Sequence, residues 1–213
     1  MPSSAMPPLG RLHVVTDTEL QTRHSHAALA RLAALGGVET VQFRQKHGSM
    51  RERWRMLTET ADVCQSIGVP LIVDDHADLA LAVGSGLHVG QEDLPVTVAR
   101  LLLGGSSTVG ATASTAAEAR EAEAAGASYI GFGPVFGTTS KANPAPAPGL
   151  HGLADACAAV SIPVVAIGGI TPAHVGDVLA AGAWGIAVLS AIVCAPDVTA
   201  AAATFRDAIE AAR

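Results

Sequence analysis

Residues 87–95 read Leu-His-Val-Gly-Gln-Glu-Asp-Leu-Pro. A short apolar run ends in a glycine turn, two carboxylates follow, and Pro95 marks the start of a helix. The preceding apolar run, Leu71–Val73, is closed in a similar way by the acidic pair Asp74 and Asp75. This strand–turn–helix unit recurs along the chain and decides the fold.

Eight apolar runs alternate with helix-period stretches rich in alanine and leucine. The runs lack polar alternation, which is typical of parallel strands covered on both faces. Eight such units in succession predict an α/β fold, a single (β/α)8 TIM barrel. An open doubly wound sheet is disfavoured, because no Gly-x-Gly-x-x-Gly motif opens the first helix and polar residues follow many strands. The predicted strands are Leu12–Val15, Val38–Phe43, Leu71–Val73, Leu87–Val89, Thr108–Gly110, Tyr129–Phe132, Val164–Ile167 and Gly185–Leu189. The predicted helices include His26–Leu35, Arg51–Ile67, Thr115–Ala125, Pro172–Ala181 and Val198–Ala212.

The length of 213 residues suits one large domain. We expect a flexible N-terminal lead-in over residues 1–9 and a catalytic barrel over residues 10–213. The lead-in has no basic residue and no apolar core, so it does not resemble a signal peptide. With 49% hydrophobic but only 3% aromatic residues, the core must be built from aliphatic side chains.

Charge and cysteine usage exclude several classes of partner. The net charge of −6 argues against a general nucleic-acid surface. No apolar run approaches the roughly 20 residues needed to span a bilayer, so we expect no membrane partner. Three widely spaced cysteines, Cys64, Cys157 and Cys194, indicate free thiols in a reducing cytoplasm rather than disulfides.

A basic cluster closes the second predicted strand. Strand alternation places Gln42, Arg44 and Lys46 on one side, with Phe43 and Gln45 on the other. Arginine offers phosphate oxygens a planar fork and lysine a point charge. In a barrel the active site lies at the carboxyl ends of the strands, so this cluster predicts an anion site; a solvated rim is the alternative.

Acidic side chains close the next two strands. Asp75 and Asp93 follow strands that are neighbours in barrel order, so their oxygens can converge on a hard cation such as Mg²⁺. The competing interpretation makes Asp74 and Asp93 helix caps. His88 lies within its strand, where a packed, hydrogen-bonded histidine is more common than a ligand.

A long loop, residues 133–149, follows the sixth strand and contains Thr138, Ser140 and Lys141. A loop of this length in a compact domain is usually functional, and its hydroxyls and charge suit an anion. A merely polar loop is the alternative.

Paired glycines follow the seventh strand and small residues follow the eighth. Gly168 and Gly169 expose backbone amides beside a helix start, and the turn at Ser190, Ala191 and Ile192 lies after the last strand. Barrels frequently bind phosphate at these two loops. Two anion pockets, one with a cation, predict a reaction between two phosphorylated small molecules.

At this point the residues resemble a known family, the thiamine phosphate synthases with their TenI-type thiazole tautomerase relatives. The segment from Gly90 to Pro95 is the most specific match. The other matching segments are Val14–Asp17, Gln42–Lys46, Asp75–Leu81, Leu87–Val89, Gly131–Phe136, Thr138–Lys141, Ala166–Ile170 and Ser190–Ile192.

The resemblance implies a cytoplasmic transferase of thiamine biosynthesis. It joins 4-amino-2-methyl-5-pyrimidinylmethyl diphosphate to a thiazole phosphate, with dissociative loss of diphosphate and dependence on Mg²⁺. The implied catalytic residues are Arg44, Lys46 and Lys141, and the implied metal ligands are Asp75 and Asp93. The implied substrate-binding residues are Gln42, Arg44, Lys46, Asp74, Thr112, Thr138, Ser140, Lys141, Gly168, Gly169, Ser190, Ala191 and Ile192.

The sequence also departs from the family pattern. Asp74 stands where the synthases commonly have asparagine, His76 stands where arginine is frequent, and Ser114 replaces a histidine that is the acid–base group proposed for the tautomerase. A tautomerase-like enzyme and a non-catalytic binder of phosphate ligands therefore stay open as alternatives. The sequence leaves a homodimer open as well.

Overall fold

The structure, a computed structural model, describes residues 9–137 and 147–212. Eight parallel strands pair in chain order and close into a barrel. They are β1 (Leu12–Thr16), β2 (Thr40–Phe43), β3 (Leu71–Asp74), β4 (Gly86–Val89), β5 (Val109–Ala113), β6 (Tyr129–Phe132), β7 (Val164–Ile167) and β8 (Gly185–Val188). Closure occurs where β1 pairs with β8, with His13 beside Ala187. The predicted (β/α)8 TIM barrel is confirmed.

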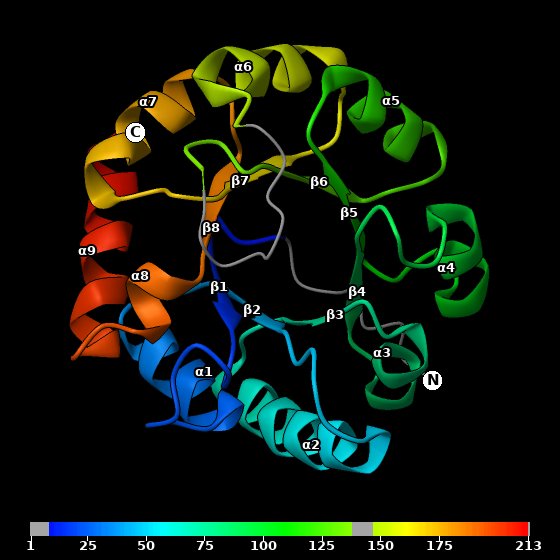
Figure 1. Ribbon diagram of the computed structural model, residues 1–213, viewed down its shortest axis with the longest axis vertical. Coiled ribbons are helices and arrows are strands. Elements are labelled where there is room, and N and C mark those ends of the chain that lie inside the picture. Colours follow the sequence, from blue (N-terminus) through cyan, green and yellow to red (C-terminus); the bar gives the residue numbers. More distant parts are fainter. Residues whose placement is uncertain (1–8, 138–146, 213) are drawn as a thin grey trace.

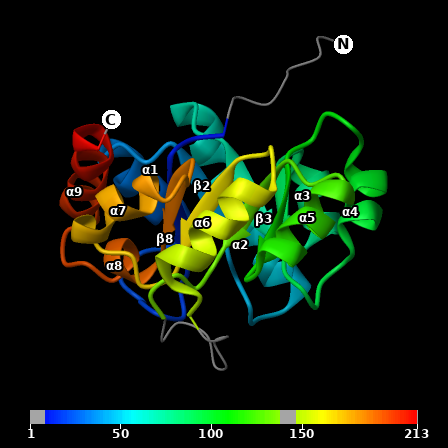
Figure 2. The ribbon, with the colours of Figure 1, turned by 90° about the horizontal axis from the view of Figure 1, so that it is seen from above.

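The helices form a single outer layer around the barrel (Figures 1 and 2). They are α1 (His26–Leu35), α2 (Met50–Ile67), α3 (Ala77–Val83), α4 (Val96–Leu103), α5 (Ala116–Ala124), α6 (Gly149–Ala159), η1 (Pro172–His174), α7 (Val175–Ala180), α8 (Ser190–Val193) and α9 (Val198–Ala211). Within residues 9–137 and 147–212, none of these helices has the length and apolar character of a transmembrane span.

Some predicted bounds were wrong. The predicted helix Pro172–Ala181 is a 3-10 turn, η1, followed by α7, because Thr171 and His174 form a capping box around Pro172. Strand β5 runs on to Ala113, since it keeps pairing with β6 up to Phe132. The small-residue turn after β8 is the single-turn helix α8.

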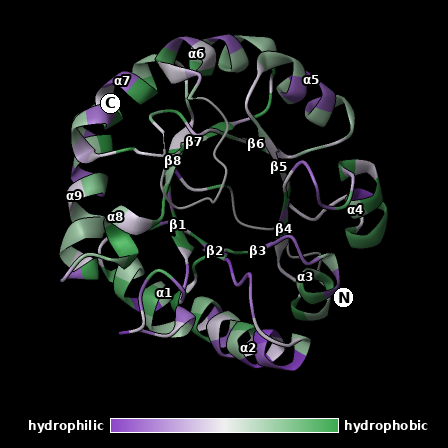
Figure 3. Cartoon of the chain, viewed as in Figure 1, coloured by the Kyte–Doolittle hydropathy of each residue, from purple (hydrophilic) through white to green (hydrophobic). Residues whose placement is uncertain are grey.

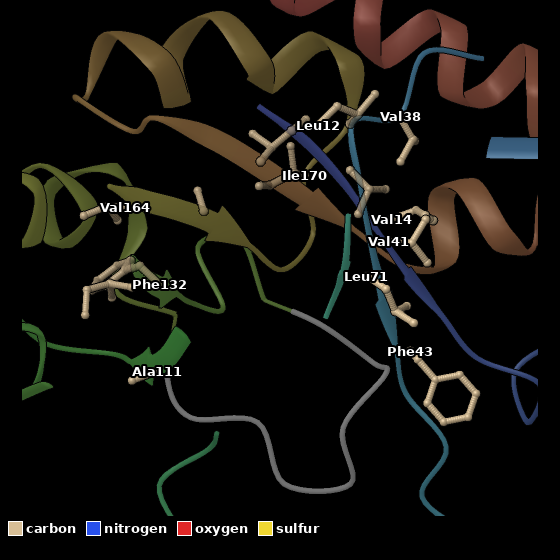
Figure 4. Close-up of a cluster of buried hydrophobic side chains, with 14 of the residues drawn as sticks. Leu12, Val14, Val38, Val41, Phe43, Leu71, Ala111, Phe132, Val164 and Ile170 are labelled. Atoms are coloured by element: carbon tan, nitrogen blue, oxygen red, sulfur yellow. The ribbon is translucent and has the colours of Figure 1, made fainter. Parts of the chain in front are cut away.

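Strand alternation divides the core into two layers. In β1, Leu12 and Val14 point outward and pack in the large cluster between the strands and the helices. Figure 4 shows Val14 beside Val41, its register partner on β2. The inward position Val15 instead belongs to a small cluster inside the barrel, built from Val15, Ile72, Tyr129, Val165 and Ala187. The thin interior cluster leaves room for a cavity above it.

The amino-terminal end of the barrel is closed by packing near the start of the described chain. Trp184 donates from Nε1 to the Leu9 carbonyl at 3.1 Å, and the Arg11 guanidinium lies 4.7 Å from the centre of the indole ring. Leu9 also packs against the interior cluster. The remaining residues of the predicted lead-in, 1–8, lie outside the described part of the chain. Access to the interior is therefore from the carboxyl ends of the strands.

Candidate active site

A cavity of about 1020 Å³ opens at the carboxyl ends of the strands. Residues from all eight strands or the loops after them line it. The predicted site residues that line it are Gln42, Arg44, Lys46, Asp74, Asp75, Asp93, Thr112, Gly168, Gly169, Ser190 and Ala191. Ile192 does not, because its side chain is fully buried in the core and its amide donates to Leu189 at 3.1 Å. Thr138, Ser140 and Lys141 lie outside the described residues.

The basic residues after β2 face the cavity as the alternation predicts. The Arg44 amide donates to the Thr16 carbonyl at 3.2 Å, so β1 continues to support the chain beyond Phe43. Phe43 points the other way and packs against the His26 ring, 4.4 Å away. Figure 3 shows that the segment between β2 and α2 is hydrophilic, in contrast to the strand. Extended backbone thus aims Arg44 and Lys46 into one space.

Lys46 lies against the two acids at the end of β3. Its Nζ contacts the Asp75 carboxylate and lies 3.5 Å from Asp74 Oδ2. Burial alone would lower the pKa of Lys46, but these carboxylates outweigh burial and raise it. Lys46 therefore stays charged at the mouth of the cavity.

Asp75 is the one non-glycine residue in the described chain with a left-handed backbone, at φ 64°. An aspartate in this region costs free energy, on the order of 1 kcal/mol or more, so the surroundings must hold it there. Its amide donates to the His88 carbonyl at 2.8 Å, which continues the pairing of β3 with β4. This bend turns Asp75 toward the loop after β4, since β3 and β4 lie side by side (Figure 1).

Asp75 and Asp93 share a hydrogen bond between their carboxyl groups. Burial, and to a smaller extent Asp75, raises the pKa of Asp93. Burial would also raise the pKa of Asp75, but Lys46 outweighs it and lowers that pKa. Two carboxyl groups held this close repel each other when both are ionised. Either a proton or a bound cation relieves that repulsion.

The helix-cap alternatives for these acids are wrong. The residue at the cap position of α3 is His76, which makes no side-chain capping bond, and Asp74 points instead to Gln42. At α4 the cap position is Pro95, while Asp93 Oδ2 accepts from the Gly90 amide at 2.7 Å. Asp93 therefore closes the turn within residues 90–93, and its carboxyl group faces the cavity.

The floor of the cavity contains polar groups, and sequence reasoning missed three of them as lining residues, His13, His88 and Tyr129. His88 Nδ1 lies 2.9 Å from the Tyr129 hydroxyl, and His88 Nε2 lies 2.9 Å from Thr112 Oγ1. The expectation that His88 is hydrogen-bonded is correct, but its ring also lines the cavity. His13 lines it as well and is buried. A histidine inside an otherwise apolar strand was the available signal for both.

The glycines after β7 have left-handed backbones, with φ 100° at Gly168 and 65° at Gly169. Both positions are also crowded, since a Cβ at Gly169 would lie 2.9 Å from the Phe136 carbonyl oxygen. The Gly168 carbonyl accepts from the Phe136 amide at 3.0 Å. Side chains are therefore excluded at these two positions, which line the cavity together with Ser190 and Ala191. Backbone without side chains suits the close approach of an anion.

Ser114 has a structural role that differs from that of an acid–base group. Its hydroxyl donates to Glu118 Oε2 at 2.9 Å and its amide donates to the same oxygen at 2.7 Å. With Thr115 these bonds cap the start of α5. Nothing at Ser114 replaces the histidine that the tautomerase interpretation requires.

Known proteins resemble this chain along almost its whole length. A family model described as thiamine monophosphate synthase matches residues 12–192. The thiamine-phosphate synthase of Salinibacter ruber is 53% identical over 210 residues, covering 98% of this chain and 92% of that protein. The thiamine-phosphate synthase of Chloroflexus aurantiacus is 49% identical over 197 residues, covering 92% of this chain and 91% of that protein.

A solved structure of similar sequence also has the same fold. Thiamine phosphate pyrophosphorylase from Pyrococcus furiosus superposes with a TM-score of 0.86 at 36% identity, covering 95% of this chain and 96% of that chain. A KDPGal structure superposes with a TM-score of 0.74 at 19% identity, covering 97% of each chain, and shows the barrel fold alone.

Proposed function

The chain belongs to the thiamine monophosphate synthase family, and from that membership we propose how its cavity joins a pyrimidinylmethyl diphosphate to a thiazole phosphate. It is a transferase that forms thiamine phosphate, as its relatives' names and their coverage of almost the whole chain establish. The tautomerase alternative is not retained, because Ser114 is engaged with Glu118. The assignment of roles to single residues is the proposal.

The observation that supports these roles is the juxtaposition of opposite charges at one edge of the cavity. Lys46 contacts Asp75, and Asp75 in turn meets Asp93. Arg44 lines the same wall with its side chain 17% exposed. Two cations beside a convergent acidic pair suit a diphosphate and its counter-ion better than a single phosphate.

The reaction needs the departure of an anion rather than a nucleophilic side chain. The bond between the pyrimidine methylene carbon and the diphosphate oxygen breaks, and the diphosphate leaves with the electron pair. The thiazole nitrogen then donates its lone pair to that carbon, so atoms and charge balance without a proton transfer. Arg44 and Lys46 stabilise the charge that develops on the leaving oxygens, which is worth most in a partly buried site.

Asp75 and Asp93 fit Mg²⁺. Their carboxyl groups lie against each other, and a cation would relieve the repulsion between them. Within residues 9–137 and 147–212 no third histidine, cysteine or acid completes a metal cluster. Mg²⁺ commonly uses one or two carboxylates together with waters and substrate phosphates. When bound, it would neutralise charge on the leaving diphosphate.

The thiazole phosphate is assigned to the opposite side of the cavity. Gly168 and Gly169 leave backbone accessible there, and Ser190 adds a hydroxyl. Gln42, on β2 shortly before Arg44, lines the same cavity, and we assign its side chain to the pyrimidine ring. Thr138, Ser140 and Lys141 keep their family roles as predictions.

The deciding experiment supplies both substrates to the purified protein with Mg²⁺ or with EDTA. We expect thiamine phosphate and diphosphate in equal amounts with Mg²⁺ and no product with EDTA. Product formation that is unchanged by EDTA would remove Mg²⁺ from the proposal. Binding of both substrates without any product would overturn the proposed reaction itself.

We also propose a homodimer that uses the outer faces of α3 and α4. Leu101 is 83% exposed, Leu81 and Leu102 are about half exposed, and α4 buries Ala99 alone. The one charged side chain of α4, Arg100, donates to carbonyls of its own chain. The exposed side chains of α4 are thus mainly apolar, which suits burial against a second copy. Light scattering should give the mass of a dimer for the wild type and the mass of a monomer for Leu101→Lys. A monomeric wild type, or binding of another protein at this face instead, would contradict the proposed homodimer.

A cytoplasmic location also belongs to the proposal. Its support is that Cys64, Cys157 and Cys194 are all unpaired. Burial raises the pKa of the Cys64 thiol to about 12, which keeps it unreactive. Localisation of the tagged protein by fractionation would test the location directly.

A further inference from the structure

Asp17, directly after β1, is a buried carboxylate whose two oxygens have different partners. It is 1% exposed. Its Oδ1 accepts from the amides of Glu19 and Leu20 at 2.7 and 3.0 Å. Its Oδ2 contacts Nη1 of Arg44. Because the backbone after β1 holds one oxygen, the position of the other oxygen is set before Arg44 is bound.

Arg44 is the group that this carboxylate orients. Its backbone is held by Thr16, and its Nε lies 3.9 Å from Asp74 Oδ2. The guanidinium is a rigid plane with five donors, so fixing Nη1 fixes the direction of all of them. Asp17 holds one end of this plane from behind, and the side chain otherwise lines the cavity.

Further contacts join the same two loops on the side away from the cavity. Thr18 donates to Gln45 Oε1 at 2.8 Å, and the amide of His47 donates to Glu19 Oε1 at 3.0 Å. His26 Nε2 lies 2.9 Å from Gln45 Oε1. Residues 17–19 therefore support residues 44–47 at three successive points. Of these three, the Asp17 contact is the one that reaches a cavity-lining cation.

We propose that Asp17 is a positioning residue that acts through Arg44 and prepares it for the diphosphate of the pyrimidine substrate. This inference rests on the proposed function. A buried ion pair contributes little net stability when its desolvation is counted. Its benefit here is geometric. A guanidinium that is already held in place loses little side-chain entropy when the anion binds.

The test is a double-mutant cycle of Asp17→Asn and Arg44→Ala, read by calorimetric binding of inorganic pyrophosphate with Mg²⁺. Asparagine keeps an oxygen for the Glu19 and Leu20 amides but presents an NH₂ group to Arg44. We expect Asp17→Asn to weaken binding about 10- to 100-fold, by analogy with the loss of a residue that orients a metal ligand. In the Arg44→Ala background the same change should have an effect below about twofold, since the group that it orients is gone.

Steady-state kinetics separate positioning from a general structural role. Asp17→Asn should raise KM for the pyrimidine diphosphate and leave KM for the thiazole phosphate unchanged. Glu19→Gln is the matched control: it removes the neighbouring acid, retains an oxygen for the His47 amide, and should bind pyrophosphate like the wild type. Equal losses for both substrates, or the same loss in the Arg44→Ala background, would overturn the proposal.

Asp17→Ser covers the case in which asparagine prevents folding, because a serine hydroxyl can still accept the Glu19 amide. If both variants unfold at the assay temperature, Asp17 is structural and the inference is wrong. Wild-type turnover of the two substrates is measured first, and its absence counts against the proposed function. If the wild type shows no turnover, the pyrophosphate binding cycle still decides the role of Asp17. A wild-type protein that binds no pyrophosphate would overturn the inference about Asp17.

Discussion

Gln42 Nε2 donates a hydrogen bond to Asp74 Oδ1 at 2.7 Å, joining the end of β2 to the end of β3 inside the cavity. Asp74 stands where the family pattern has asparagine, and its side chain is 10% exposed. Burial raises the pKa of Asp74, and the adjacent Asp75 adds to this. Lys46 and Arg44 offset part of the effect. The chain therefore places an additional acid beside its proposed diphosphate site.

Replacement of this acid by asparagine should strengthen anion binding. In Asp74→Asn the new Oδ1 can keep the bond from Gln42, while one negative charge facing the diphosphate is removed. A like charge in this setting costs about 1 kcal/mol, or roughly fivefold in Kd. Calorimetric titration with pyrophosphate at pH 8 checks this, and an unchanged Kd would show that Asp74 carries no charge in the folded protein.

Asp93 should be essential for the cation and dispensable for the fold. Asp93→Asn retains an oxygen for the Gly90 amide but loses the charge, whereas Asp93→Ala loses both. We expect Mg²⁺-dependent turnover to fall in both variants by at least the roughly 10- to 100-fold that a lost outer partner costs at a metal site. Thermal unfolding should be near the wild-type value for Asp93→Asn. Wild-type activity in either variant would reduce Asp93 to a turn residue.

Gly131 should tolerate no side chain, because it makes room for His88. A Cβ at this position would lie 2.7 Å from His88 Cε1 and would push the ring away from Tyr129 and Thr112. Gly131→Ala should destabilise the protein by about 1–3 kcal/mol and reduce turnover. Gly176→Ala in α7 is the matched control, since no atom lies within 4 Å of its new Cβ. That variant should gain about 0.5–1 kcal/mol in urea unfolding. A neutral Gly131→Ala would show that the His88 position is adaptable.

His13 should make the protein sensitive to acid. Burial lowers the pKa of His13 to about 4 from 6.5, so the folded state resists a proton that the unfolded state accepts. The contribution of neutral His13 to the free energy of unfolding is complete above pH 6.5. It is lost as the pH falls from 6.5 to about 4, and the loss is on the order of 3 kcal/mol in total. His13→Gln should flatten the unfolding free energy across that window.

His26 leaves some acid dependence in the His13 variant, because burial lowers its pKa as well. The matched control is His151→Gln, which changes a side chain that is 92% exposed and should retain the wild-type profile. If His13→Gln and His151→Gln lose stability equally between pH 6.5 and 4, His13 is not responsible for the acid sensitivity.

The sequence alone was sufficient for the barrel and for most of the cavity wall. Apolar runs without alternation reveal parallel strands because burial on both faces is a local requirement. Residues after those strands then share one edge by topology. Gln42, Arg44, Lys46, Asp75 and Asp93 were found in this way and do line one cavity. Ile192 was misplaced, because the turn after β8 is a helix that directs it into the core.

Only the tertiary structure decided which of these groups meet. The contact of Asp17 with Arg44 depends on the register between β1 and β2. The contact of His88 with Tyr129 depends on two registers, that of β4 with β5 and that of β5 with β6. The left-handed bend that turns Asp75 toward Asp93 is likewise held by the pairing of β3 with β4. Periodicity reports burial, which is a property of one segment. The distance between two charges depends on barrel closure, which no single segment encodes.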